Sequence, residues 1–184
     1  MFGTQKITPM LWFDDNAEEA VNHYISIFKN SRIVKMAHRG EAGPGPKGSV
    51  LTIGFELEEQ AFTALNGGPL FKFSEAISLV VNCETQAEVD ELWDKLSEGG
   101  QKGQCAWLKD KFGVSWQVVL TALIEMLCGD DGAKSAGVIR AMMRMSKIDL
   151  EALKRAHEAE TSYLTTARRR GVPAVSQAPS EAVV

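Results

Sequence analysis

A strand followed by a helix is predicted by residues 6–28, Lys6-Ile-Thr-Pro-Met-Leu-Trp-Phe-Asp-Asp-Asn-Ala-Glu-Glu-Ala-Val-Asn-His-Tyr-Ile-Ser-Ile-Phe28. Apolar residues dominate up to Phe13, and the polar run Asp14-Asp15-Asn16 ends the strand. Asp15 is placed to cap the helix, with Glu18 three residues later as its capping-box partner. Residues at helical spacing then form one apolar face: Ala17, Ala20, Val21, Tyr24, Ile27 and Phe28.

The same unit occurs a second time between Ile77 and Leu96. Ile77-Ser-Leu-Val-Val81 predicts a strand, and Thr85-Gln-Ala-Glu88 forms a second capping box. The apolar face of the second helix consists of Val89, Leu92, Trp93 and Leu96. The two units lie roughly 68 residues apart, which predicts two similar modules side by side.

Between and after these units the pattern predicts an α+β fold with two tandem βαβββ modules. The first module covers residues 5–69 and has its further strands at 32–38, 48–57 and 60–66, with a turn at Glu58-Glu59. The second module, residues 70–120, is shorter or irregular because one strand lacks a full equivalent. Residues 121–160 predict a helical extension whose third helix is capped by Asp149, and residues 165–184 read as a disordered tail.

Composition limits the classes of function. The chain has 184 residues, 45% of them hydrophobic, and a formal net charge of −4. Its one basic cluster is Arg168-Arg169-Arg170, so we expect no nucleic-acid partner. We also expect no membrane segment, because no apolar run reaches the roughly 18 residues that a spanning helix needs. Cys83, Cys105 and Cys128 fit neither a disulfide framework nor a zinc site, and no secretory signal is visible, which favours a cytoplasmic protein.

Several short motifs together resemble a known superfamily. They are Met10-Leu-Trp-Phe-Asp14, Ala64-Leu-Asn-Gly-Gly-Pro69, Phe73-Ser-Glu-Ala-Ile-Ser78, Trp107-Leu-Lys-Asp110 and Phe112-Gly-Val-Ser-Trp-Gln117. With the two modules, they resemble the vicinal oxygen chelate (glyoxalase/bleomycin-resistance) superfamily and its PhnB-like branch, described as 3-demethylubiquinone-9 3-methyltransferase-like. The resemblance implies two curved sheets that enclose a cleft, commonly in a homodimer.

Metal-dependent members of that superfamily take ligands from the first and last strand of each module. By strand pattern those positions correspond to Thr8, Ala64, Ala76 and Gln117. Thr, Ala and Gln are poor ligands for a divalent metal, so we expect the usual metal site to be missing. We also expect no cofactor, because Gly43-Pro-Gly45 lies in a loop and does not form the glycine-rich strand-to-helix turn of a nucleotide site.

The resemblance still implies a ligand cleft. Its candidate residues are Thr8, Trp12, Ala64, Asn66, Phe71, Glu75, Ala76, Trp107, Trp116 and Gln117, with Lys109 at the rim. For the aromatic residues the alternative is core packing, and for Asn66 it is a turn that ends a strand. Glu75 is the candidate catalytic residue, since a carboxylate in an apolar cleft would have a raised pKa and act as an acid or base. Its alternative is a solvated charge on the linker.

Two functional hypotheses follow, with a third behind them. The first is a small-molecule-binding protein that works without the usual metal. The second is an enzyme of the superfamily, a lyase, transferase or oxygenase, with a non-standard site. The third is a structural or regulatory dimer whose methionines Met142, Met143 and Met145 contact a partner.

Overall fold

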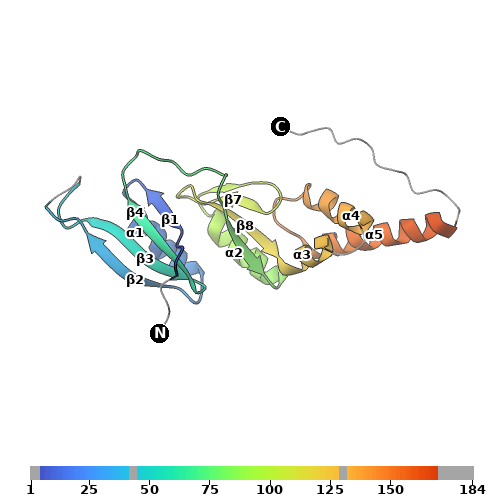
Figure 1. The fold of residues 1–184 in the computed structure, drawn as a ribbon. Helices are drawn as coiled ribbons and strands as arrows, with labels where there is room; N and C mark the ends of the chain where they lie inside the picture. The colour runs from blue at the N-terminus through green and yellow to red at the C-terminus, as the bar shows by residue number, and fades with distance from the viewer. Residues whose placement is uncertain (1–4, 42–44, 129–131, 170–184) are drawn as a thin grey trace.

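The computed structural model describes residues 5–41, 45–128 and 132–169, and side-chain burial as far as residue 159 (Figure 1). The elements of the first module are β1 (Met10–Phe13), α1 (Ala17–Ile27), β2 (Arg32–His38), β3 (Val50–Leu57) and β4 (Gln60–Asn66). Those of the second are β5 (Leu79–Cys83), α2 (Gln86–Ser97), β6 (Gln101–Lys102), β7 (Trp107–Lys109) and β8 (Ser115–Leu120). Three helices follow, α3 (Thr121–Cys128), α4 (Gly132–Met142) and α5 (Leu150–Arg169).

The two modules share one sheet topology, which confirms the predicted α+β fold. Their strand orders are β1-β4-β3-β2 and β5-β8-β7-β6. In each sheet one pair is parallel, β1 with β4 and β5 with β8, and the other pairs are antiparallel. The second sheet is the shorter one, as predicted, because β6 has two residues and β7 has three. β1 begins only at Met10, after Pro9, which has no N–H to offer a neighbouring strand.

Alternation along the strands gives each sheet a helix side and an open face. In the first module Leu11, Phe13 and Ala64 point to the helix side and are buried beneath α1. The open face carries the residues between them, such as Met10, which pairs with Thr63. In the second module the helix side holds Trp116, Val118 and Leu120, and the open face holds Val80 and Gln117, which pair across β5 and β8.

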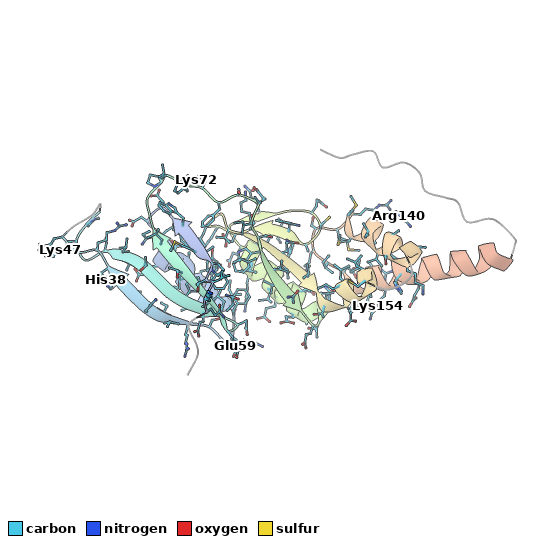
Figure 2. All side chains as sticks on the ribbon, viewed as in Figure 1. His38, Lys47, Glu59, Lys72, Arg140 and Lys154 are labelled. Atoms are coloured by element: carbon cyan, nitrogen blue, oxygen red, sulfur yellow. The ribbon has the colours of Figure 1, made fainter. Side chains whose placement is uncertain are left out.

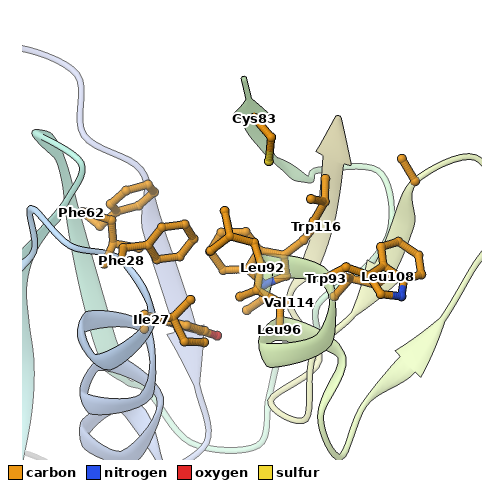
Figure 3. Packing of buried hydrophobic residues seen from close by; sticks show 14 of the residues in the cluster. Ile27, Phe28, Phe62, Cys83, Leu92, Trp93, Leu96, Leu108, Val114 and Trp116 are labelled. Carbon is orange, nitrogen blue, oxygen red and sulfur yellow. The ribbon is translucent and has the colours of Figure 1, made fainter. Parts of the chain in front are cut away.

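The helix sides of the two modules meet in one shared core. Tyr24 of α1 and Phe28, the residue after α1, lie against Trp116 of β8, with ring centroids 5.4 and 5.7 Å from the Trp116 ring. Figure 3 shows Ile27, Phe28 and Phe62 of the first module facing Leu92 and Trp116 of the second. Because the helices lie between the sheets, the two open faces point away from this core (Figure 1).

A buried carboxylate joins the modules within that core. Asp110 is 3% exposed and accepts four hydrogen bonds. Its Oδ2 accepts from the Tyr24 hydroxyl at 2.7 Å and from the Trp116 indole N–H at 2.8 Å, and its Oδ1 accepts from the backbone N–H groups of Phe112 and Val114. Burial, followed by the Asp110 carboxylate, raises the pKa of Tyr24 well above its ordinary value, so Tyr24 remains a donor.

Three helix starts were predicted from the sequence, and two are confirmed. Thr85 accepts a hydrogen bond from Glu88 N–H, and Asp149 accepts one from Ala152 N–H. The prediction for Asp15 is wrong, because α1 is capped from another strand. Its first N–H, on Ala17, donates to Oδ1 of Asn66 at the end of β4, 2.9 Å away.

The C-terminal helices dock on the second module. Gln86 of α2 donates to the carbonyl of Ile148 and accepts from Leu150 N–H, which fixes the start of α5. Cys105 and Ala106 both have positive φ, and their N–H groups donate to the carbonyls of Met145 and Ser146. No helix within residues 5–41, 45–128 and 132–169 is long and apolar enough to cross a membrane. The disordered tail predicted over residues 165–184 lies outside the described residues from 170 onward, and its first part is wrong because residues 165–169 belong to α5.

Replacing Asp110 tests the junction. Asp110→Ala leaves two buried side-chain donors and two backbone N–H groups without their acceptor, so it should lower the free energy of unfolding by ~3–5 kcal/mol. Tyr24→Phe removes one charged hydrogen bond and should cost about 1.5–3 kcal/mol. Urea unfolding followed by tryptophan fluorescence measures both.

Asp94→Ala is the control, since Asp94 is exposed and its pair with Lys102 is 3.9 Å long. A cost for Asp110→Ala as small as the control's would contradict the assignment.

Candidate functional site

The predicted cleft residues do not gather in one cleft of a single chain. Thr8 belongs to the open side of the first module, whereas Gln117 lies on the open face of the second. These faces point away from the shared core, so the open faces of one chain do not enclose a common cavity. Four side chains at the implied metal-ligand positions therefore cannot surround one ion within a single chain.

On the open face of the second module, five of the predicted residues lie near one another. Lys109 Nζ forms an ion pair with the Glu75 carboxylate. Gln117 donates through Nε2 to the Ser78 hydroxyl at 2.8 Å, and Trp107 pairs with Gln117 across β7 and β8. Ala76 lies in the turn next to Glu75 and is exposed.

The pKa predicted for Glu75 is wrong in direction. Its side chain is 65% exposed, not enclosed in an apolar cleft. The hydrogen bond from Lys109 is the main cause that lowers the pKa of Glu75 below its ordinary value. A carboxylate with a lowered pKa stays ionised at neutral pH, so this geometry does not support a general acid.

Trp12 and Phe71 pack against each other beside the turn that follows β4. Their ring centroids are 4.9 Å apart in an edge-to-face arrangement, and Phe71 is 58% exposed. The Trp12 indole N–H donates to the carbonyl of Gly68 at 2.9 Å. A Cβ on Gly67 would lie 2.3 Å from the indole ring, so only glycine lets the ring rest against this turn.

Three other candidates lie in the interior. Ala64 is fully buried on the helix side, so the prediction that it faces a cleft with Thr8 is wrong; Thr63 takes the open-face position instead. Asn66 is 4% exposed and serves as the acceptor at the start of α1. Trp116 is 2% exposed and contacts Asp110 in the shared core, as the core-packing alternative predicted.

The open face of the first module carries a groove of about 750 Å³. Its charged lining residues are Lys29, Arg32, Lys35, Glu56 and Glu59. Uncharged polar residues also line it: Gln5, Thr8, Asn30, Ser31 and Thr63. Val34, Phe55, Ala61 and Phe62 add an apolar part to the lining. Among the ten predicted cleft residues, Thr8 is the one that lines this groove.

Sequence reasoning missed two residues at the floor of this groove, Lys35 and Gly54. Lys35 pairs with Gly54 across β2 and β3, and both line the groove. A glycine inside a strand is a signal for the close approach of another group. Gly54 gave that signal within the strand predicted over residues 48–57.

A second groove, of about 740 Å³, lies between the modules. Its apolar wall includes Phe28 and Phe62 from the first module and Leu79, Leu92 and Trp116 from the second. Helix-side residues of both sheets line it, so it differs in place from the groove on the open face. Lys29, Asn30 and Phe62 line both grooves.

The residues on the open faces do not fit a divalent metal. The positions on the first and last strands offer the hydroxyls of Thr8 and Thr63, the hydroxyl of Ser78 and the amide of Gln117. Zn²⁺ and related ions take His, Cys and carboxylate ligands. Within the described parts of the chain, no three His, Cys, Asp or Glu residues are grouped so that they could hold an ion.

Comparison with protein families shows which family this chain belongs to. A family model described as 3-demethylubiquinone-9 3-methyltransferase matches residues 5–119. The chain belongs to this family. The match spans both modules and ends before α3–α5, and it confirms the PhnB-like relationship indicated by the sequence motifs. No protein with a curated description matches the chain.

The chain is similar to several solved structures. A PhnB protein from Bacillus cereus is 40% identical, with 64% of this chain and 100% of that chain covered and a TM-score of 0.57. A protein from Pseudomonas aeruginosa is 23% identical, with 64% and 98% covered and a TM-score of 0.54. The fosfomycin resistance protein FosX from Listeria monocytogenes is 13% identical, with 67% and 98% covered and a TM-score of 0.45.

Titration of Glu75 distinguishes the ion pair from an acid–base site. We expect a carboxyl pKa below the ordinary glutamate value, because Lys109 stabilises the charged form. Lys109→Met should move this pKa upward. Carbon-detected NMR of the Glu75 carboxyl group from pH 2 to 8, in wild type and in Lys109→Met, measures the change. A wild-type pKa above the ordinary glutamate value would restore the acid–base interpretation.

Proposed function

We propose that this protein binds a small organic molecule on the open faces of its sheets without the divalent metal of its metal-dependent relatives. The groove on the open face of the first module is the observation that supports this most directly. It combines a volume suited to a small ligand with hydroxyl, amide and charged side chains in one concave face.

The absence of a suitable donor set supports the metal-free part of the proposal. The side chains that replace the usual ligands are hydroxyls and an amide, which suit hydrogen bonding to an organic ligand better than coordination. The alternative of a superfamily enzyme relied on Glu75, whose exposure and ion pair with Lys109 do not favour it.

Methyl transfer, which the family description names, is not part of the proposal. A Rossmann-type cofactor site needs a glycine-rich turn between a strand and a helix of a parallel sheet. Here β1 leads into α1 through Asp14-Asp15-Asn16, and β5 leads into α2 through Glu84-Thr85. Neither turn contains glycine, and each sheet has a single parallel pair.

A homodimer is part of the proposal because apolar residues are exposed near the free sheet edges. β1 and β5 each have a partner on one side only. Exposed apolar side chains lie on or just before them: Ile7 is 85% exposed, Met10 60%, Ile77 79% and Val80 52%. A second copy that covers these edges would bury this surface and close the outward-facing groove. Free Cys83, Cys105 and Cys128 suit the cytoplasmic location predicted from the sequence.

Metal analysis and native mass spectrometry of one untagged sample test the proposal. We expect less than about 0.1 transition metal per chain, because the open faces lack suitable ligands. We also expect the mass of a dimer, with a retained small molecule whose mass identifies it. About one tightly held metal per chain, lost together with ligand binding on chelation, would contradict the metal-free proposal.

A further inference from the structure

Lys35 reaches the open face because β2 carries a bulge. Arg32 pairs with Glu56 and Lys35 pairs with Gly54, so three residues of β2 advance where β3 advances by two. Val34 is the extra residue. The bulge therefore places Lys35 on the same face as Arg32, where simple alternation would have turned it away.

Gly54 provides the space that the Lys35 side chain occupies. A Cβ on Gly54 would lie 2.9 Å from Cγ and 3.0 Å from Cε of Lys35. The alkyl stem of Lys35 therefore lies across Gly54 of β3, while the side chain as a whole remains exposed at the groove that it lines.

The surroundings of Lys35 suit an anion. Along one row of the sheet, Gly54 pairs with Thr63, and Thr63 pairs with Met10. The hydroxyls of Thr63 and Thr8 line the same groove. The Glu56 carboxylate is held by Arg32 at 2.9 Å, and Lys35 has no ion-pair partner in residues 5–41, 45–128 or 132–169.

We infer that Lys35, seated on Gly54, anchors an anionic group of the ligand, a carboxylate or a phosphate ester, with Thr63 and Thr8 beside it. This inference rests on the proposed binding function and specifies its ligand class as a small organic acid. An ammonium group binds either anion through short charge-assisted hydrogen bonds. The apolar remainder of the ligand would extend along the same row towards Met10.

Titration with benzoate and with phenyl phosphate tests the inference, since the two probes share a ring and differ in their anion. Amide chemical shifts in ¹⁵N-labelled protein should change first at Lys35, Gly54 and Thr63. Lys35→Met should weaken binding about two- to fivefold, the value of one charged contact at an exposed site. The tighter of the two probes identifies the anion.

Two further variants distinguish the effect of the position of Lys35 from the effect of net charge alone. Gly54→Ala keeps the lysine, but its Cβ occupies the space in which the Lys35 stem lies. It should therefore weaken binding about as much as Lys35→Met. Lys72→Met removes the same charge from the linker, at the opposite end of the module from Glu59, and should leave binding unchanged (Figure 2). Equal binding by wild type and Lys35→Met, or equal weakening by Lys72→Met, would overturn the inference.

The native molecule, once recovered, separates this inference from the proposed function. If it binds Lys35→Met and Gly54→Ala as tightly as wild type, the anionic anchor is wrong and the binding function stands. If wild type retains no molecule and binds neither probe, both are wrong.

Discussion

The buried carboxylate of Asp110 determines how the two halves of the molecule are arranged. It accepts hydrogen bonds from Tyr24 in one module and from Trp116 in the other, across 86 residues of sequence in the first case. A buried charge is tolerated only when such donors surround it. Because Tyr24 lies on α1 and Trp116 on the helix side of β8, the bonds hold helix side against helix side. Both open faces consequently point away from the junction between the modules.

This arrangement explains why binding surface and core are separate in this protein. The apolar residues of α1 and α2 pack in the shared core. The aromatic side chains on the helix sides of the sheets pack there with them. The open faces keep small and polar residues such as Thr63 and Gln117. A ligand on these faces meets hydrogen-bonding groups and Lys35, and a second copy is what would enclose it.

Much of the fold was predictable because it depends on local pattern. The two strand–helix units, the capping residues Thr85 and Asp149, and the short second sheet all follow from spacing along the chain. The error at Ala64 has a simple origin, since a shift of one residue in a strand turns a side chain to the other face. The cap on α1 was missed because its acceptor, Asn66, lies 49 residues away from Ala17.

The site was less predictable because it depends on contacts between distant segments. Nothing local marks Asp110, between Lys109 and Lys111, as a junction of modules, and nothing local shows that Glu75 meets Lys109. Lys35 required the bulge at Val34 as well as the glycine at 54. The resemblance to a family therefore predicted the fold correctly. The location of the cleft residues that it implied had to come from the structure.

The shared core is tested most directly by ¹⁵N relaxation of the wild-type protein. Amides of residues 10–66 and 79–120 should report one common rotational correlation time, because a rigid junction makes the modules tumble as one body. Two distinct and shorter correlation times would show that the modules move independently. They would contradict the role of Asp110 and, with it, the outward direction of the open faces.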